Sequence, residues 1–189
     1  MPNTNPAAIT ASSVEAKKKI ASETSLVNYN FFIGASHDNL DELLSITNVP
    51  GIKIYMGSTT GNLLMNDPQI LAQLFEKSPH LIAVHAEDES IIQGNLIKFG
   101  GVDDPRLHYQ IRSPEAALKA TQEAVSLAKR YHARLHVCHL TTQEEVVFLN
   151  DFKTDPLITT EVTPQHLLLY GPDIYETKGT FAQINPPIR

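Results

Sequence analysis

The stretch "LIAVHAED", residues 81–88, decides the fold class that the sequence predicts. It begins with four consecutive apolar residues, two of them β-branched, and polar residues follow at once. A strand that is apolar without interruption is typical of a parallel sheet covered on both faces. The stretch therefore predicts a buried parallel strand that ends at His85.

Four more short, apolar-rich runs resemble this one, at residues 26–33, 51–56, 134–140 and 157–162. Helical patterns lie between them, at residues 12–22, 38–46, 68–77, 113–131 and 142–151. Ser113 is the expected N-cap of the fourth helix, with Pro114 at its first position, and Asn66 is the expected cap of the third. Strands that alternate with helices predict parallel pairing through right-handed crossovers.

Two α/β architectures fit this alternation, an open doubly wound sheet and a (β/α) barrel. The segment "GSTTG", residues 57–61, lacks the lysine of a phosphate loop and the spacing of a dinucleotide site, which weakens the nucleotide-binding alternative. A complete eight-stranded barrel usually needs about 250 residues, whereas this chain has 189 and about five βα units. We therefore expect a partial barrel, with residues 1–189 as the central part of a single domain.

Composition limits the partners and the compartment. The formal net charge is −6, with 42% hydrophobic and 19% charged residues, as in an ordinary soluble globular protein with neither a nucleic-acid partner nor a membrane span. The basic run at residues 17–19 has acidic neighbours and is typical of a solvated helix face. A single cysteine, Cys138, and the lack of a signal-peptide pattern predict a reducing cytoplasm.

Three polar residues interrupt or end the predicted strands: Lys53, His85 and His139. Functional groups of parallel α/β folds gather at the carboxyl ends of strands. Two imidazoles and an oxygen donor from three strand ends would make a catalytic zinc site with an open position for water. Lys53 lies between two isoleucines, where a buried ammonium is costly unless it is paired or chemically changed.

Simpler interpretations stay open for these residues. The histidines could be satisfied core residues, Lys53 could pair with Glu87 or Asp88, and Cys138 could be a small buried hydrophobe. Period-2 alternation places His139 on one face of its strand and His136 with Cys138 on the other, so only one of these two histidines should point into a barrel. The histidines in loop or helix-end contexts are not expected to be ligands; they are His37, His80, His108 and His132.

The ordered segments "MPNTNP", "GIKIYMGSTTG", "HAED", "HVCHLTT", "EVTPQHLLL" and "INPPIR" resemble the dihydroorotases of the cyclic amidohydrolase superfamily, from the first residue to the last. The resemblance implies a metal-dependent (β/α)8 TIM barrel that interconverts N-carbamoyl-L-aspartate and (S)-dihydroorotate in de novo pyrimidine (UMP) biosynthesis. Allantoinases and hydantoinases share the lysine and the two histidines, and "MPNTNP" together with "EVTPQHL" favours dihydroorotase over them.

The resemblance also implies roles for individual residues. Lys53 would be carboxylated and bridge two zinc ions, and His85 and His139 would bind the second zinc. Asn3 would help to hold the substrate carboxylate, and Asn185 would contact the pyrimidine ring. His166 matches a motif of unassigned role, and Pro164 beside it suggests a structural turn.

Several parts of the family pattern are missing from this sequence. The first barrel strand, with a His-x-His pair for the first zinc and a substrate-binding arginine, would precede Met1. The general acid/base aspartate of a late strand is expected beyond Arg189. We therefore expect an incomplete, inactive fragment lacking the first and last barrel strands. The alternative is a non-catalytic dihydroorotase-like subunit that scaffolds aspartate transcarbamoylase, and association into a homo-oligomer also stays open.

Overall fold

The computed structural model describes residues 1–58, 63–100 and 103–189, and "GSTTG" lies mostly outside these residues. Its five strands form one parallel sheet in chain order. They are β1 (Ile33–Gly34), β2 (Gly51–Tyr55), β3 (Leu81–His85), β4 (Leu135–Val137) and β5 (Ile158–Thr160). A doubly wound sheet reverses its strand order at a switch point, and the described strands show no reversal. The order therefore decides between the two expected architectures, in favour of part of a (β/α) barrel.

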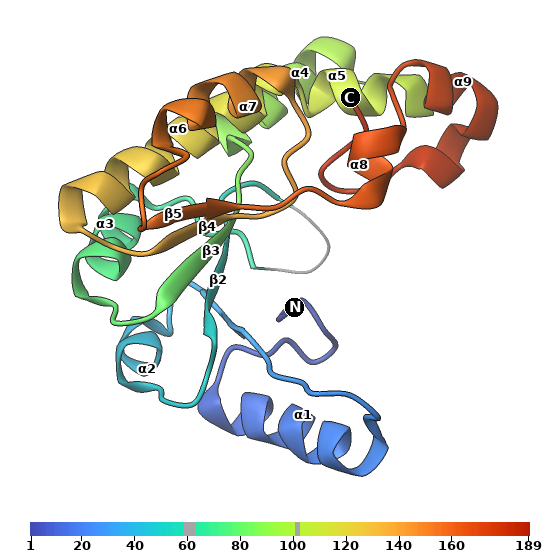
Figure 1. Ribbon diagram of the computed structural model, residues 1–189. Helices are drawn as coiled ribbons and strands as arrows, with labels where there is room; N and C mark the ends of the chain where they lie inside the picture. Colours follow the sequence, from blue (N-terminus) through green and yellow to red (C-terminus); the bar gives the residue numbers. More distant parts are fainter. Residues whose placement is uncertain (59–62, 101–102) are drawn as a thin grey trace.

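The helices follow the strands in the expected alternation. They are α1 (Ala11–Thr24), α2 (Leu40–Ser45), α3 (Pro68–Lys77), α4 (Glu89–Phe99), α5 (His108–Ile111), α6 (Pro114–Tyr131), α7 (Gln143–Leu149), α8 (Pro164–Leu168) and α9 (Asp173–Lys178). Short 3-10 helices lie at Pro105–Leu107, Asn150–Phe152 and Gly179–Ala182. Figure 1 shows α3, α6 and α7 along one side of the sheet, where α2 packs on α3, α3 on α6 and α6 on α7.

Helix α6 illustrates how local sequence sets an element and its buried face. The Ser113 side chain accepts a hydrogen bond from the backbone N–H of Ala116, and Pro114 fills the first turn, as expected. His132 ends the helix in the left-handed conformation, with φ of 57°. The buried face consists mainly of alanines, namely Ala116, Ala117, Ala120, Ala124 and Ala128. Small side chains let the helix pack closely against its neighbours.

The sheet separates an apolar face from a polar one. Ile52, Ile82 and Leu135 pair across β2, β3 and β4, and all three are fully buried in the hydrophobic core with the helices. The alternate residues, among them Lys53 and His85, point to the opposite face. One face of the sheet therefore packs into the hydrophobic core, and the other holds the polar candidate site residues.

Each predicted strand run contains a strand, but the first run was wrong in extent. Only Ile33 of residues 26–33 lies in β1, and Leu26 is fully exposed. Asparagines at positions 28 and 30 interrupt this run, and such residues favour turns over strands. The predicted Asn66 cap was also wrong, because the Asp67 side chain accepts from the N–H groups of residues 69 and 70.

Helix α4 was missing from the predicted elements. Asp88 caps it through the N–H of Ile91, and Ile92 is its fully buried residue. A helix with so little buried apolar surface shows a weak periodic signal. No helix in the described part of the chain has the length and apolarity needed to cross a membrane.

Candidate metal centre

The strand register places the polar residues of the inner face in rows. Lys53 of β2 pairs with Ala83 of β3, which pairs with His136 of β4. Tyr55 pairs with His85 at the end of the same strands. Paired residues of neighbouring strands point to the same face. Lys53, Tyr55, His85 and His136 therefore share the face opposite the helices.

Lys53 is fully buried at the base of this face. Its Nζ lies 3.1 Å from Cys138 Sγ and 5.2 Å from the ring centroid of Tyr55. Burial lowers the pKa of Lys53, although Cys138 and Glu161 oppose the shift. A lowered pKa increases the share of neutral amine, which is the nucleophilic form of lysine.

The alternative in which Lys53 pairs with Glu87 or Asp88 was wrong. Glu87 instead accepts hydrogen bonds from His85, Arg112 and Arg189. Asp88 caps α4 and lies 2.9 Å from the amine of Lys119. Cys138 is buried, as expected, but its contact with the Lys53 amine gives it a polar role as well.

His85 and His139 meet at the end of the sheet. Nδ1 of His85 lies 3.2 Å from Nε2 of His139, and their ring centroids are 5.0 Å apart. Two nitrogens bound tetrahedrally to one zinc ion at about 2.0–2.1 Å would lie about 3.3 Å apart. Burial lowers the pKa of both imidazoles, that of His139 to about 2. Neutral imidazole is the form that binds metals, so this pair fits a shared ion.

His139 reaches this position because β4 ends early. The strand stops at Val137, and His139 has a φ of 39°, in the left-handed region. His136 also lies on the inner face, where its Nδ1 is 2.9 Å from Thr159 Oγ1. The expectation that only one of these two histidines points inward was therefore wrong. Period-2 alternation applies only while the chain stays extended.

A second group of donor atoms lies beside Lys53. One ligand atom from each of His136, Cys138 and Glu161 lies within 4.8 Å of the others. Nε2 of His136 is 3.4 Å from a Glu161 oxygen. A nitrogen, a sulfur and an oxygen form a donor set that suits zinc. The sequence shows the His-x-Cys spacing, but only the register of β4 with β5 brings Glu161 beside it.

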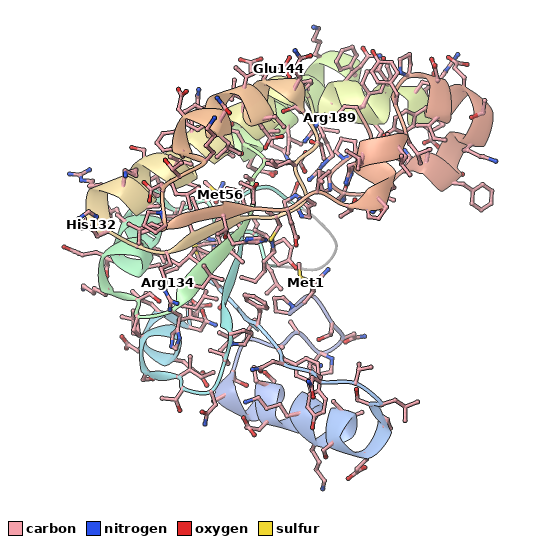
Figure 2. All side chains as sticks on the ribbon, in the orientation of Figure 1. Met1, Met56, His132, Arg134, Glu144 and Arg189 are labelled. Carbon is pink, nitrogen blue, oxygen red and sulfur yellow. The ribbon has the colours of Figure 1, made fainter. Side chains whose placement is uncertain are left out.

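A cavity of about 540 Å³ opens beside the two histidines. Its lining includes Asn3, Tyr55, His85, His108, His139 and Asn185, together with Met1, which is labelled in Figure 2. The Tyr55 hydroxyl donates to Asn3 Oδ1 at 2.9 Å, and Nε2 of His108 donates to the Ile184 carbonyl at 2.8 Å. Four site residues predicted from the sequence therefore share one cavity. Tyr55 is an addition from the structure, and His108, which was not expected to be a ligand, also lines the cavity.

Glu87 is a fully buried carboxylate directly behind His85. Its Oε2 accepts from His85 Nε2 at 2.9 Å and from Arg112 Nη2 at 2.6 Å, and its Oε1 accepts from Arg189 Nη1 at 3.0 Å. Burial alone would raise the pKa of Glu87. The hydrogen bond from His85 and the two guanidinium groups outweigh burial and hold the pKa well below its usual range. The sequence analysis considered Glu87 only as an ion-pair partner of Lys53 and did not place it beside His85, although it stands two positions after that residue.

Both ring nitrogens of His166 lie within hydrogen-bond distance of nearby oxygen atoms. Nδ1 lies 2.7 Å from Thr163 Oγ1, and Nε2 lies 3.0 Å from the Pro186 carbonyl oxygen. The residue sits in α8, which begins at Pro164. These contacts agree with a structural turn at this motif.

Comparisons with known proteins match the whole chain, although no family model matches it. A dihydroorotase of Methanosarcina acetivorans is 32% identical over 200 residues, covering 100% of this chain and 42% of the relative. The multifunctional protein CAD of Squalus acanthias is 30% identical over 190 residues, covering 98% of this chain and 7% of that protein. The chain thus spans less than half the length of these relatives.

Solved structures extend the likeness to the fold. An L-hydantoinase (dihydropyrimidinase) from Arthrobacter aurescens superposes with a TM-score of 0.90 and 26% identity, covering 100% of this chain and 44% of that one. The expected barrel class is confirmed, because the five parallel strands match this amidohydrolase barrel along their full length. The resemblance inferred from the sequence motifs is confirmed as well.

Proposed function

Because the chain is a dihydroorotase-like amidohydrolase over its whole length, we propose that its protein is a zinc-dependent enzyme that interconverts N-carbamoyl-L-aspartate and (S)-dihydroorotate in pyrimidine biosynthesis. The observation that carries this proposal is the single cavity lined by His85, His139, Asn3 and Asn185. This cavity holds two neutral imidazoles, the form of histidine that binds metals, and two amide side chains that suit a polar ring.

The proposed zinc ligands are His85, His139 and carboxylated Lys53. Zinc, when bound, would act as a Lewis acid on the ring amide and make water available as a nucleophile near neutral pH. Burial keeps both histidines neutral and favours the neutral amine of Lys53. That amine can add to carbon dioxide, forming a nitrogen–carbon bond and releasing one proton to solvent. The product is an anionic carbamate, which removes the cost of a buried cation.

Asn3 and Asn185, which both line the cavity, would bind the substrate. Tyr55 donates its hydroxyl proton to Asn3 Oδ1, which restrains the Asn3 side chain. His108 holds the carbonyl of Ile184, the residue before Asn185. The carboxylate and ring oxygens of dihydroorotate are acceptors of the kind these amides can bind.

The domain assignment and the activity of the isolated chain are part of the proposal. We place residues 1–189 in the central part of one barrel domain. The His-x-His pair and the acid/base aspartate implied by the family resemblance are not among these 189 residues. The isolated chain should therefore show no turnover, because water activation and proton transfer would each lack a group worth orders of magnitude in rate.

Association with aspartate transcarbamoylase is a further part of the proposal, supported by the similarity to the multifunctional protein CAD. A purely scaffolding subunit is less well supported, because it would have no need for Lys53, His85 and His139. Hydantoinase activity is the second candidate function, favoured by the TM-score of 0.90 with an L-hydantoinase.

The decisive experiment measures zinc-dependent turnover by the full-length protein with dihydroorotate, hydantoin and allantoin. We expect dihydroorotate to be the best substrate, with activity lost on chelation and restored by zinc. His139→Asn should abolish turnover, whereas His132→Asn, at an exposed helix end, should not. Faster turnover of hydantoin would support the second candidate. Failure to hydrolyse any cyclic amide would refute both.

A further inference from the structure

The side-chain cluster behind His85 has no part in the proposed ligand set. Glu87 lies at its centre, fully buried, and three side chains donate to its two oxygens. Arg112 and Arg189 are also largely buried, with side chains 8% and 2% exposed. One carboxylate thus lies between a candidate metal ligand and two cations.

We propose that Glu87 is a positioning residue that fixes the tautomer and ring orientation of His85, and that Arg112 and Arg189 hold Glu87 in place. This inference rests on the proposed function, since it concerns how His85 would meet a metal ion. It assigns a role to a residue outside the metal ligands and the substrate contacts.

The tautomer follows from the hydrogen-bonding capacity of the two groups. An ionised carboxylate can only accept hydrogen bonds, so the proton of the 2.9 Å contact belongs to Nε2 of His85. Nδ1 then keeps its lone pair, and this atom faces Nε2 of His139 at 3.2 Å. Histidine ligands commonly donate their other ring N–H to a carboxylate, which orients the ring and raises its basicity.

The two arginines connect Glu87, which follows β3, to the segments that follow β2 and β4. Arg112 Nη2 also donates to the carbonyl of Ser58, after β2, and Arg189 Nε donates to Thr141 Oγ1, after β4. Arg189 Nη1 further donates to the Arg112 carbonyl oxygen. These contacts restrain Glu87 from several directions. Replacement of Arg189 should therefore move the Glu87 carboxylate and, with it, the ring of His85.

Glycine at position 57 adds a close backbone contact to this arrangement. A Cβ at Gly57 would lie 2.7 Å from the Glu87 carbonyl oxygen and 2.9 Å from Glu87 Cβ. Contacts this short require a shift of the backbone. The packing of β2 against the segment after β3 therefore fixes the backbone of Glu87, as the arginines fix its side chain.

The alternative role for Glu87 is general stability as the centre of a buried ion cluster. Glu145 offers a matched control, because it is also a buried carboxylate, 3% exposed, and accepts from Thr121 and Thr142 at 2.8 Å. Within the described part of the chain, Glu145 makes side-chain hydrogen bonds with Thr121, Thr141 and Thr142, none of which is a candidate metal ligand. A general effect of neutralising a buried carboxylate should therefore appear in both Glu87→Gln and Glu145→Gln.

The test combines two measurements on the full-length protein and its variants. Nitrogen-15 NMR of the metal-free protein reports the tautomer of His85, assigned by comparison with His85→Gln. Zinc affinity is measured by competition with a chromophoric chelator. We expect Glu87→Gln to populate the Nδ1–H tautomer and to lower zinc affinity by about 10- to 100-fold. Glu145→Gln should change neither quantity.

Glu87→Asp provides a second variant in case Glu87→Gln fails to fold. Aspartate keeps the negative charge beside both arginines but shortens the reach to His85, so zinc affinity should still fall. The inference is overturned by an Nδ1–H tautomer in the parent, by unchanged zinc affinity in both Glu87 variants, or by an equal loss in Glu145→Gln. The tautomer measurement needs neither metal nor substrate, so it still tests the positioning role of Glu87 if the proposed enzymatic function is refuted.

Discussion

Replacement of Lys53 by methionine should stabilise the metal-free protein while removing its proposed function. Lys53 is fully buried, and among the described residues its amine has one hydrogen-bond partner, Cys138 Sγ at 3.1 Å. Methionine keeps the unbranched apolar stem of lysine and removes the amine. Residues needed for function often make the folded protein less stable than an apolar replacement would.

The magnitude follows from two opposing contributions. Desolvation of one buried ion costs several kcal/mol after relaxation, whereas a hydrogen bond to a charged group contributes about 1.5–3 kcal/mol. We therefore expect Lys53→Met to raise the free energy of unfolding by about 1–3 kcal/mol at pH 7. For a chain of this size the melting temperature should rise by about 2–12 °C.

The pH dependence gives an internal check of the same reasoning. Burial lowers the pKa of Lys53 below its unfolded value of 10.5, so the unfolded chain binds more protons between these two pKa values. Stability of the parent then rises with pH across that window. The advantage of the methionine variant should therefore shrink as pH approaches 10.5.

The assay is urea and thermal unfolding of the metal-free protein, followed by circular dichroism at several pH values. Lys153→Met is the matched control, because Lys153 is exposed, and it should change stability by less than about 0.5 kcal/mol. If Lys53→Met lowers stability by more than about 1 kcal/mol, the reasoning is refuted, and the Lys53 amine makes a stabilising contact that methionine cannot replace.

Four further outcomes are expected. Lys53→Ala and Lys53→Arg should each abolish zinc-dependent turnover in the full-length protein, because neither side chain can form a carbamate. Lys53→Glu should keep part of the turnover, since a carboxylate can also bind zinc. An Arg variant with the zinc content and activity of the parent would exclude Lys53 from the site. His139→Asn should lower zinc affinity at least about tenfold by competition titration, and unchanged affinity would exclude it as a ligand. Tyr55→Phe should raise KM about fivefold at similar kcat, as expected for one hydrogen bond to Asn3; a loss confined to kcat would contradict a binding role. Because the folded protein lowers the pKa of Glu87, ionised Glu87 stabilises the fold above the unfolded pKa of 4.5, and this stabilisation is lost as pH falls. Glu87→Gln should therefore weaken the dependence of the free energy of unfolding on pH below 4.5, and an unchanged dependence would contradict the lowered pKa.

Sequence patterns predicted the sheet well because its strands are short apolar runs between turn-forming residues. The pattern at residues 68–77 coincides with α3, and residues 113–131 contain α6. It failed at residues 26–32, where apolar residues lie outside the sheet. Strand pairing depends on a partner that local sequence does not specify.

The candidate site was predictable only in part. His85 and His139 could be selected because each lies at or near the end of an apolar run. Glu87 could not, because its importance comes from Arg112 and Arg189, 25 and 102 residues away in the chain. The inward position of both His136 and His139 was equally hidden, since alternation predicts the face only for extended backbone and His139 has a positive φ.

The contact between Glu87 and Arg189 also bears on the order of folding. Each strand of the sheet pairs with the next one along the chain, so the sheet can grow unit by unit as the chain is synthesised. The Glu87–Arg189 pair closes a loop of 102 residues, and closing long loops is slow. We expect hydrogen exchange during refolding to protect β2 and β3 before the segment around Glu87. The cluster around Glu87 should thus become rigid last, after the strands that carry Lys53 and His85 have formed.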